Sequence, residues 1–426
     1  MPRDDGLALE PGRPYIRRSI RASAGKALVG MTDRHDAACL GGPRARGYGA
    51  ACMIYLDYNA TAPLLPEARR AMIDALDLFG NPSSAYGGGR AARAALESAR
   101  RTIAEAAGVE PREVTFTSGA TESNNTALFG TVDPTRGKAL VFTAIEHSSV
   151  TATAAELERR GARPRGLPFD AHGRVAPAAV AASLGDDTGV VSVGWANNEI
   201  GTVQDVEEIA AVCRAKKVLF HTDAVQAFGR IATRLPDADL ISISSHKLGG
   251  PKGIGALVRR RGAAVRPLLF GGAQERGLRA GTENVVAACG FAAAVAVAVA
   301  DGATELREQL WRGLSEIPGV VRHSPIDGCL PNTLLVGFAG IRGEAMVAGL
   351  DLDGVAVSVG SACAAGSGEP SHVLLALGRD EDAARSGVRF STGPATTAAE
   401  VDEVVGIVHT LVARMRSVRM AAGGGR

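Results

Sequence analysis

Apolar runs of strand length alternate with helical patterns between residue 64 and about residue 300, and this alternation constrains the fold most. The strand-length runs lie at residues 138–144, 189–196, 218–225 and 239–246. Turn residues bound each run, as is typical of buried strands. Residues 206–217, between two of the runs, repeat apolar side chains at helical spacing. This order predicts an α/β fold with a covered parallel sheet, whose ligands bind at the carboxyl ends of the strands.

A smaller α+β unit is expected after about residue 302. Helices are predicted at residues 303–317, 371–378 and 397–418, and strands at residues 331–338, 355–360 and 387–393. We therefore expect a large domain at 64–302, a small domain made of 53–63 and 303–415, and a tail at 416–426.

Residues 1–52 differ from the rest because Arg, Gly and Ala dominate them without a sustained period. A strand, a turn and a helix follow directly after Met53. We expect Met53 to be the natural start and residues 1–52 to be a disordered or non-native extension. The alternative is a targeting peptide, because residues 15–30 are Arg-rich and lack acidic residues, although acidic residues flank them.

Charge and cysteine content exclude several classes of partner. The 47 basic and 45 acidic residues give a formal charge of +2, which indicates neither a nucleic-acid nor an anionic-membrane partner. Residues 285–300 carry no charge, but the stretch is short and Ala-rich, so a buried helix is expected. The six cysteines include no CxxC pair, which predicts no metal site and favours a reduced cytoplasmic setting.

Three segments carry residues suited to one cofactor. Lys247 follows a predicted strand and precedes a Gly-rich turn, and Asp223 ends the preceding strand. Alone, each fits an ordinary turn lysine or a helix cap. Together they favour a pyridoxal site, which needs an amine for a Schiff base and an acid for the pyridine nitrogen. Small residues at 117–125 before a helix also suit a phosphate, although a helix cap explains them equally well.

The chain resembles the cysteine desulfurases among the fold-type-I pyridoxal-phosphate enzymes, on the branch that serves iron–sulfur and nitrogen-fixation assembly. The matching segments run in family order from about residue 54 to 412: YLDYNATAP, GNPSS, FTSGATESNN, EHSSV, ANNEIGTVQ, HTDAVQAFG, SSHKLGGPKGIGAL, RAGTEN, VGSACAAGSGEPSHVLLALG and VRFSTG. The resemblance implies a large domain with a mainly parallel seven-stranded sheet, a smaller α+β domain, and pyridoxal 5'-phosphate as cofactor.

The resemblance also implies roles for individual residues. Lys247 would hold the cofactor, Asp223 would pair with the ring nitrogen, Gln226 would bind the ring hydroxyl, and His147 would stack on the ring. The phosphate would be held by Ala120, Thr121, Ser244 and His246, and by Thr282 from a neighbouring subunit, which implies a homodimer. Asn198 and Arg389 would bind the substrate carboxylate. Because Val388 and Phe390 flank Arg389, we expect a half-buried setting for this side chain.

Cys363 lies in a loop of small residues without a wall of large apolar side chains, whereas the other five cysteines lack this setting. An exposed thiolate of this kind suits sulfur capture. The resemblance therefore implies that L-cysteine becomes L-alanine while its sulfur passes to Cys363 as a persulfide. An acceptor protein, such as an iron–sulfur scaffold or a protein of thiocofactor assembly, would then receive the sulfur.

Two alternatives stay open at this point: a selenocysteine lyase or related pyridoxal enzyme, and a low-turnover partner of an assembly complex. Three features also depart from the family pattern. Tyr86 stands where a His is common, Pro394 stands where an Arg is common, and the C-terminus lacks the recognisable family tail. The last departure leaves the identity of the acceptor open.

Overall fold

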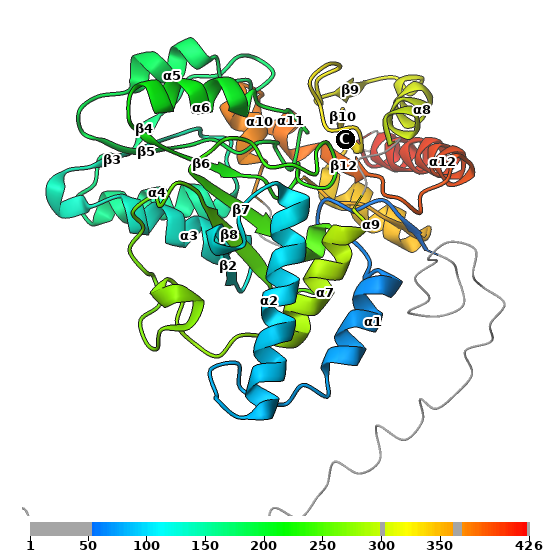
Figure 1. The fold of residues 1–426 in the computed structure, drawn as a ribbon. Helices are drawn as coiled ribbons and strands as arrows, with labels where there is room; N and C mark the ends of the chain where they lie inside the picture. Colours follow the sequence, from blue (N-terminus) through cyan, green and yellow to red (C-terminus); the bar gives the residue numbers. More distant parts are fainter. Residues whose placement is uncertain (1–52, 299–302, 361–368, 424–426) are drawn as a thin grey trace, which may run out of the picture. The chain divides into compact units, whose positions relative to one another are not determined.

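The computed structural model describes residues 53–298, 303–360 and 369–423 (Figure 1). The predicted extension at 1–52 and Cys363 both lie outside these residues.

A seven-stranded sheet forms the centre of the fold. Its order is β2 (Val114–Thr117), β8 (Gly255–Arg259), β7 (Leu240–Ser244), β6 (Leu219–Asp223), β5 (Thr188–Ser192), β3 (Ala139–Phe142) and β4 (Arg165–Gly166). Only β8 runs antiparallel to its neighbours, β2 and β7. The remaining neighbours pair in parallel, so the predicted mainly parallel sheet and its four central strand predictions are confirmed.

Helices cover both faces of this sheet because its strands are apolar on both sides. Leu140 and Val190 join one apolar cluster, whereas the next residues, Val141 and Val191, join another. The first cluster includes α3 (Ala120–Thr131) and α4 (Ser148–Arg159). The second includes α2 (Gly87–Ala107), α5 (Pro177–Ser183), α6 (Val206–Ala215) and α7 (Val285–Ala296). Two-sided burial is the expected property of parallel strands.

The uncharged stretch at 285–300 begins as α7, and eight of its helical residues are buried. The Asn284 side chain caps its first turn by accepting a hydrogen bond from the Ala287 backbone N–H at 3.0 Å. Helix α1 (Pro66–Ala75) lies beside it, where Gly290 leaves room for Met72. Within the described residues, none of the helices combines the length and apolar character needed to cross a membrane.

Two smaller sheets and a separate apolar core form the rest of the described chain. The three-stranded antiparallel sheet has the order β12 (Gly387–Ser391), β10 (Thr333–Phe338) and β9 (Val320–Arg322), and β1 (Ile54–Tyr55) pairs in parallel with β11 (Val355–Ala356). The helices of this part are α8 (Ala303–Ser315), α9 (Gly343–Leu352), α10 (His372–Ala376), α11 (Glu381–Arg385) and α12 (Ala398–Gly423). Leu314, Phe338, Leu350, Phe390 and Val408 belong to its core.

One strand prediction in this part was too long. Residues 355–360 were expected to form one strand, but only Val355 and Ala356 pair with β1. Ser358 instead makes an isolated bridge with Arg389, so the chain leaves the short ladder and passes along β12.

Candidate active site

A cavity of about 580 Å³ lies where β3, β5, β6 and β7 end, at their carboxyl sides. Its lining includes ten residues predicted from the sequence: Ala120, Thr121, His147, Asn198, Asp223, Gln226, Ser244, His246, Lys247 and Arg389. Thr282 is exposed and does not line this cavity. Cys363 lies outside the described residues. The fold thus brings together side chains separated by up to 269 positions in the sequence, in the place where sheets of this kind bind ligands.

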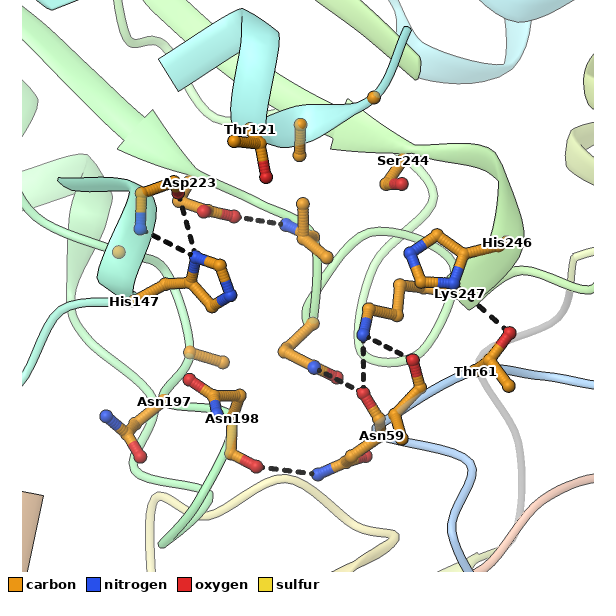
Figure 2. A pocket seen from close by; sticks show the side chains of 18 of the residues that line it. Asn59, Thr61, Thr121, His147, Asn197, Asn198, Asp223, Ser244, His246 and Lys247 are labelled. Atoms are coloured by element: carbon orange, nitrogen blue, oxygen red, sulfur yellow. Dashed lines mark hydrogen bonds between the residues drawn. The ribbon is translucent and has the colours of Figure 1, made fainter. Parts of the chain in front are cut away.

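Lys247 ends the single-turn helix Ser245–Lys247, directly after β7. Its Nζ donates hydrogen bonds to the backbone carbonyls of Asn59 and Ala60, both at 2.7 Å (Figure 2). Burial lowers the pKa of Lys247 to about 7, with further lowering by the positive charges of Arg230 and Arg389. A sizeable share of this amine is therefore neutral near pH 7, as a nucleophile or base requires.

Arg230 is a contributor that the sequence reasoning missed. Its guanidinium donates to the Asn59 side chain and the Tyr58 carbonyl, both at 2.8 Å, and to the Lys247 carbonyl at 3.3 Å. It also donates to the Gln226 side chain, whose own Nε2 donates to the Asn59 carbonyl at 3.0 Å. Arg230 therefore joins the chain segment after β1 to the lysine. Nothing in the local sequence distinguishes it from a surface arginine.

Asp223 lies at the end of β6, and His147 lies beyond the end of β3, with β5 between these two strands. Asp223 is the last residue of β6, and its Oδ2 accepts a hydrogen bond from Asn124 Nδ2 at 2.7 Å. His147 caps α4, with its Nδ1 at 2.8 Å from Ser149 Oγ. Burial lowers the pKa of His147, so its ring is mostly neutral at neutral pH. Figure 2 shows His147 and Lys247 facing each other across the cavity.

Glu146 is a second residue that the sequence reasoning passed over, although it directly precedes His147. Its carboxylate accepts from Thr143 Oγ1 at 2.7 Å and from the Gly194 backbone N–H at 3.0 Å. Burial raises the pKa of Glu146 to about 7 despite these two hydrogen bonds. A side chain at position 194 would meet this carboxylate at 2.8 Å, so the glycine is needed for the close approach.

One end of the cavity suits a phosphate group. Ala120 and Thr121, in the first turn of α3, line this end. The N-cap residue of the helix is Gly119, so no side-chain hydrogen bond caps the helix N-terminus. The uncapped backbone N–H groups and the helix dipole both favour an anion there. Ser244 and His246 line the same cavity, and His246 Nδ1 lies 3.1 Å from Thr61 Oγ1. Figure 2 shows Thr121 and Ser244 on one side of the cavity.

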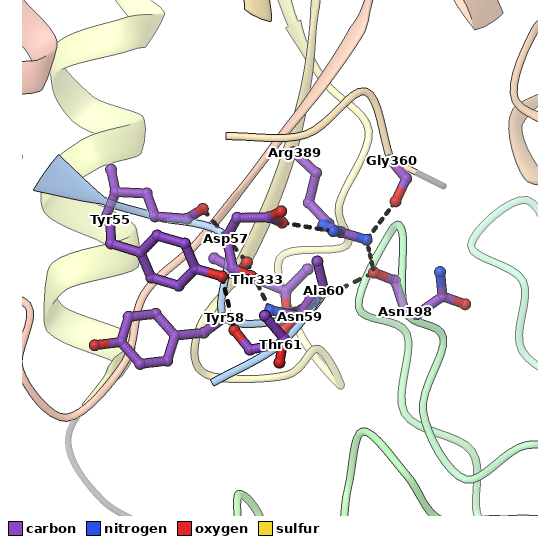
Figure 3. Close-up of polar contacts among 12 residues, drawn as sticks. Tyr55, Asp57, Tyr58, Asn59, Ala60, Thr61, Asn198, Thr333, Gly360 and Arg389 are labelled. Carbon is purple, nitrogen blue, oxygen red and sulfur yellow. Dashed lines mark hydrogen bonds and ion pairs between the residues drawn. The ribbon is translucent and has the colours of Figure 1, made fainter. Parts of the chain in front are cut away.

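Arg389 lies on β12 and reaches the same cavity from the smaller sheet (Figure 3). Its Nη2 pairs with Asp57 Oδ1 at 2.8 Å, and its Nη1 donates to the carbonyls of Asn198, at 2.9 Å, and Gly360. The prediction of a half-buried setting was wrong, because Arg389 is only 1% exposed. Carbonyl and carboxylate acceptors pair with both terminal nitrogens, which offsets the cost of burying the guanidinium, while within the described residues Nε has no hydrogen-bond partner.

The donor set fits pyridoxal 5'-phosphate by its chemistry. An amine with a lowered pKa suits an aldehyde, a carboxylate at a strand end suits a pyridinium nitrogen, and an uncapped helix N-terminus suits a phosphate. The guanidinium of the buried Arg389 is chemically suited to a carboxylate.

Comparison with known proteins gives a consistent result. Residues 54–404 match the model of the aminotransferase class-V family. The chain is 44% identical over 377 residues to a cysteine desulfurase of Cereibacter sphaeroides, a match that covers 86% of this chain and 97% of that protein. It is 40% identical over 377 residues to the cysteine desulfurase IscS of Dictyoglomus turgidum, covering 86% and 96% respectively.

Solved structures agree with these sequence matches. A NifS-like protein superposes with a TM-score of 0.79 at 36% identity, covering 85% of this chain and 99% of that one. A structure of SspA in complex with cysteine superposes with a TM-score of 0.71 at 33% identity, covering 80% and 99%. The chain therefore belongs to the aminotransferase class-V family, in its group of pyridoxal-phosphate-dependent cysteine desulfurases.

Proposed function

We propose that this protein converts L-cysteine to L-alanine and carries the released sulfur as a persulfide on Cys363. The observation that carries the proposal is the placement of Lys247, with its pKa near 7, in one cavity with Asp223, His147 and the buried Arg389. The relatives named cysteine desulfurase, and the similar structure with bound cysteine, support the same substrate.

In this proposal Lys247 holds the cofactor covalently, and Asp223 faces the ring nitrogen. His147 stacks on the ring, and Gln226 binds the ring hydroxyl. The phosphate is bound by Ala120, Thr121, Ser244 and His246, with Asn198 near the ring. When bound, the cofactor withdraws electrons from the substrate Cα and so acidifies its proton.

Different residues of the chain bind the substrate and transfer its proton. Arg389 and Asn198 bind the carboxylate, which orients the substrate relative to Lys247. Once released from the cofactor, the Lys247 amine takes the Cα proton, a role supported by its lowered pKa. The neutral His147 ring lies opposite and is available to move a proton on the other side.

Sulfur transfer is assigned to Cys363. Its thiolate attacks the substrate sulfur, so that an S–S bond forms while the Cβ–S bond of the substrate breaks. The electron pair of the broken bond stays with the carbon part, which gains protons and leaves as L-alanine. The persulfide on Cys363 then passes its outer sulfur to an acceptor.

The test is the release of alanine and sulfide from L-cysteine in the presence of a thiol reductant. Cys363→Ser should bind the cofactor normally, because no cofactor contact is assigned to this residue, but should lose at least about 100-fold in sulfide release. Cys289→Ala on α7, which lines no part of the cavity, is the matched control and should keep the wild-type rate. Full-rate sulfide release by Cys363→Ser would contradict the assignment of the persulfide.

We also propose a homodimer in which Thr282 contacts the phosphate in the neighbouring subunit. Exposure of Thr282, outside its own cavity, supports this role. Large exposed apolar side chains support a covered surface: Phe79 is 90% exposed, and the Phe79 and Tyr86 rings both lie near Gly88.

The acceptor proposed for the sulfur is an iron–sulfur scaffold protein, and the compartment proposed is the cytoplasm. The cysteines of the described chain are free thiols, at Cys213, Cys289 and Cys329, which suits a reducing compartment. The division into a large domain at 64–302 and a small domain at 53–63 and 303–415 is likewise proposed. Two separate apolar cores support it, because Ile54 and Leu56 join the core of the C-terminal part.

A further inference from the structure

An ion pair joins the segment that carries Thr282 to the phosphate-binding turn of its own chain. Arg279 Nε donates to Glu122 Oε1 at 3.0 Å, and Glu122 Oε2 accepts from the Ser118 backbone N–H at 2.8 Å. The side chains of Arg279 and Glu122 are 24% and 10% exposed. Ser118 lines the cavity beside Gly119 and Ala120. Arg279 therefore lies three residues before Thr282, and the Glu122 side chain links it to the phosphate-binding turn at Ser118.

The chain before Arg279 is anchored separately. Glu275 pairs with both terminal nitrogens of Arg100 at 2.7 Å and accepts from the Phe116 backbone N–H at 2.9 Å. Both side chains of this pair are 2% exposed. Glu275 and Arg276 adopt φ values of 46° and 57°, a left-handed backbone that non-glycine residues rarely take. The buried Arg100–Glu275 pair thus holds one end of the segment, and Arg279 makes the ion pair between the segment and α3.

The proposed function leaves open how Thr282 is presented to a neighbouring subunit. Gly281 N–H donates to Gln274 Oε1 at 3.2 Å, and Asn284 caps α7, so local contacts flank Thr282 on both sides. These contacts shape the segment but do not fix it against α3. Within the described residues, Arg279 and Glu122 make the ion pair between this segment and α3, and Leu278 lies in the same apolar cluster as Ala127 of α3.

We propose that Arg279 is a positioning residue whose effect is felt in the other subunit of the homodimer. This inference rests on the proposed function, in which Thr282 contacts the partner's cofactor phosphate. Without Arg279, Glu122 keeps its hydrogen bond from the Ser118 N–H, so the phosphate turn of the same chain is retained. The Thr282 segment loses its ion pair with α3 and keeps only the apolar packing of Leu278. The cofactor bound in the partner subunit is therefore the one that loses affinity.

The test compares two heterodimers that contain the same substitutions in different arrangements. In the first, one subunit carries Arg279→Gln and the other carries Lys247→Ala. In the second, one subunit is wild type and the other carries both substitutions. Each heterodimer keeps a single Lys247, and the affinity of that subunit for pyridoxal phosphate is measured by visible absorbance.

In the first heterodimer the intact Lys247 receives Thr282 from a subunit with Arg279, so its affinity should match that of a wild-type/Lys247→Ala reference. In the second heterodimer Thr282 comes from the Arg279→Gln subunit, and the affinity should be about tenfold weaker. A purely local structural role for Arg279 would reverse this order. The reverse order, or equal affinities, would overturn the inference.

Thr282→Val in the same two arrangements separates this inference from the proposed function. If Thr282→Val weakens binding across the dimer and Arg279→Gln does not, the inference fails and the shared site stands. If Thr282→Val has no effect across the dimer, the shared site and the inference both fail. Should Arg279→Gln subunits not assemble, Arg279→Lys keeps the charge without the two-pronged geometry, and the same order with a roughly threefold difference is expected. Equal affinities for the Arg279→Lys pair would then overturn the inference.

Discussion

The buried cations at the two ends of the cavity differ in whether a carboxylate lies beside them. At the substrate end, Arg389 is 1% exposed and pairs with the Asp57 carboxylate at 2.8 Å. At the cofactor end, Lys247 and the adjoining Arg230, which donates to the Lys247 carbonyl, contact carbonyl and amide oxygens, and in the described part of the chain neither forms an ion pair. Burial without a carboxylate partner pushes a cation toward its neutral form, whereas a carboxylate partner offsets the cost of burying the charge.

This difference matches what each residue is proposed to do. Arg389 needs a permanent charge to bind a carboxylate, and an arginine beside a carboxylate supplies it. Lys247 must be neutral to act as nucleophile or base. Burial, together with the charges of Arg230 and Arg389, lowers its pKa from 10.5 to about 7. Burial and the charge of Arg389 also lower the pKa of Arg230 to about 10, which leaves it charged at neutral pH.

The largest effect is expected from removing the Lys247 amine. Lys247→Ala should reduce alanine release from L-cysteine by about 10³-fold or more, because the proton-transfer group and the cofactor attachment are both lost. Lys216→Ala, at the exposed end of α6, is the matched control and should behave as wild type. Alanine release is measured with saturating cofactor in both variants. Substantial turnover by Lys247→Ala would remove the lysine from its assigned role.

A smaller effect is expected from replacing Arg389, which pairs with Asp57. Arg389→Lys keeps the charge beside Asp57 but loses the two-pronged geometry, so kcat/KM for L-cysteine should fall roughly 10- to 100-fold, mainly through KM. The control is Arg414→Lys, which alters an exposed pair with Asp353. The measurement is of kcat and KM for L-cysteine in both variants, by steady-state kinetics. A fall confined to kcat would indicate that Arg389 does not bind the substrate carboxylate in the ground state.

The smallest effect is a change in pH dependence. A lysine with a pKa lowered to about 7 is mostly protonated below pH 7 and mostly neutral above it. The rate at which cofactor-free enzyme takes up pyridoxal phosphate should therefore rise with pH through a midpoint near 7. Arg230→Gln removes one of the charges that lower this pKa, so the midpoint should move to higher pH and uptake at pH 7 should slow several-fold.

Arg230→Lys is the matched variant for this experiment, because it keeps a positive charge at the same position. Its midpoint should stay near that of the wild type. Absorbance of the bound cofactor, followed at a series of pH values, gives both midpoints. An unchanged midpoint in Arg230→Gln would show that burial and Arg389 lower the Lys247 pKa without Arg230, and the contrast between the two ends of the cavity would then not depend on Arg230.

The sequence alone predicted that Asp223 and Lys247 lie close together. Asp223 and Lys247 each follow an apolar run, and parallel strands place their carboxyl ends at the same edge of a sheet. Their proximity therefore follows from local patterns and one rule of topology. The small residues before α3 are a local signal of the same kind. The short strand β9 was not predicted, because a stretch of three residues carries too little periodicity, and the ten-residue helix α9 was also missed.

Tertiary structure alone decided which charges meet. Asp57 and Arg389 are 332 positions apart, and the carbonyls of Asn59 and Ala60 reach Lys247 across nearly 190 positions. Neither pairing follows from spacing, because both depend on β1 and β12 delivering their chain segments to the same cavity. The sequence determined the fold and the chemical groups available. The desolvation that lowers the Lys247 pKa and the contact between Arg389 and the Asp57 carboxylate arise only when distant segments pack together and exclude water.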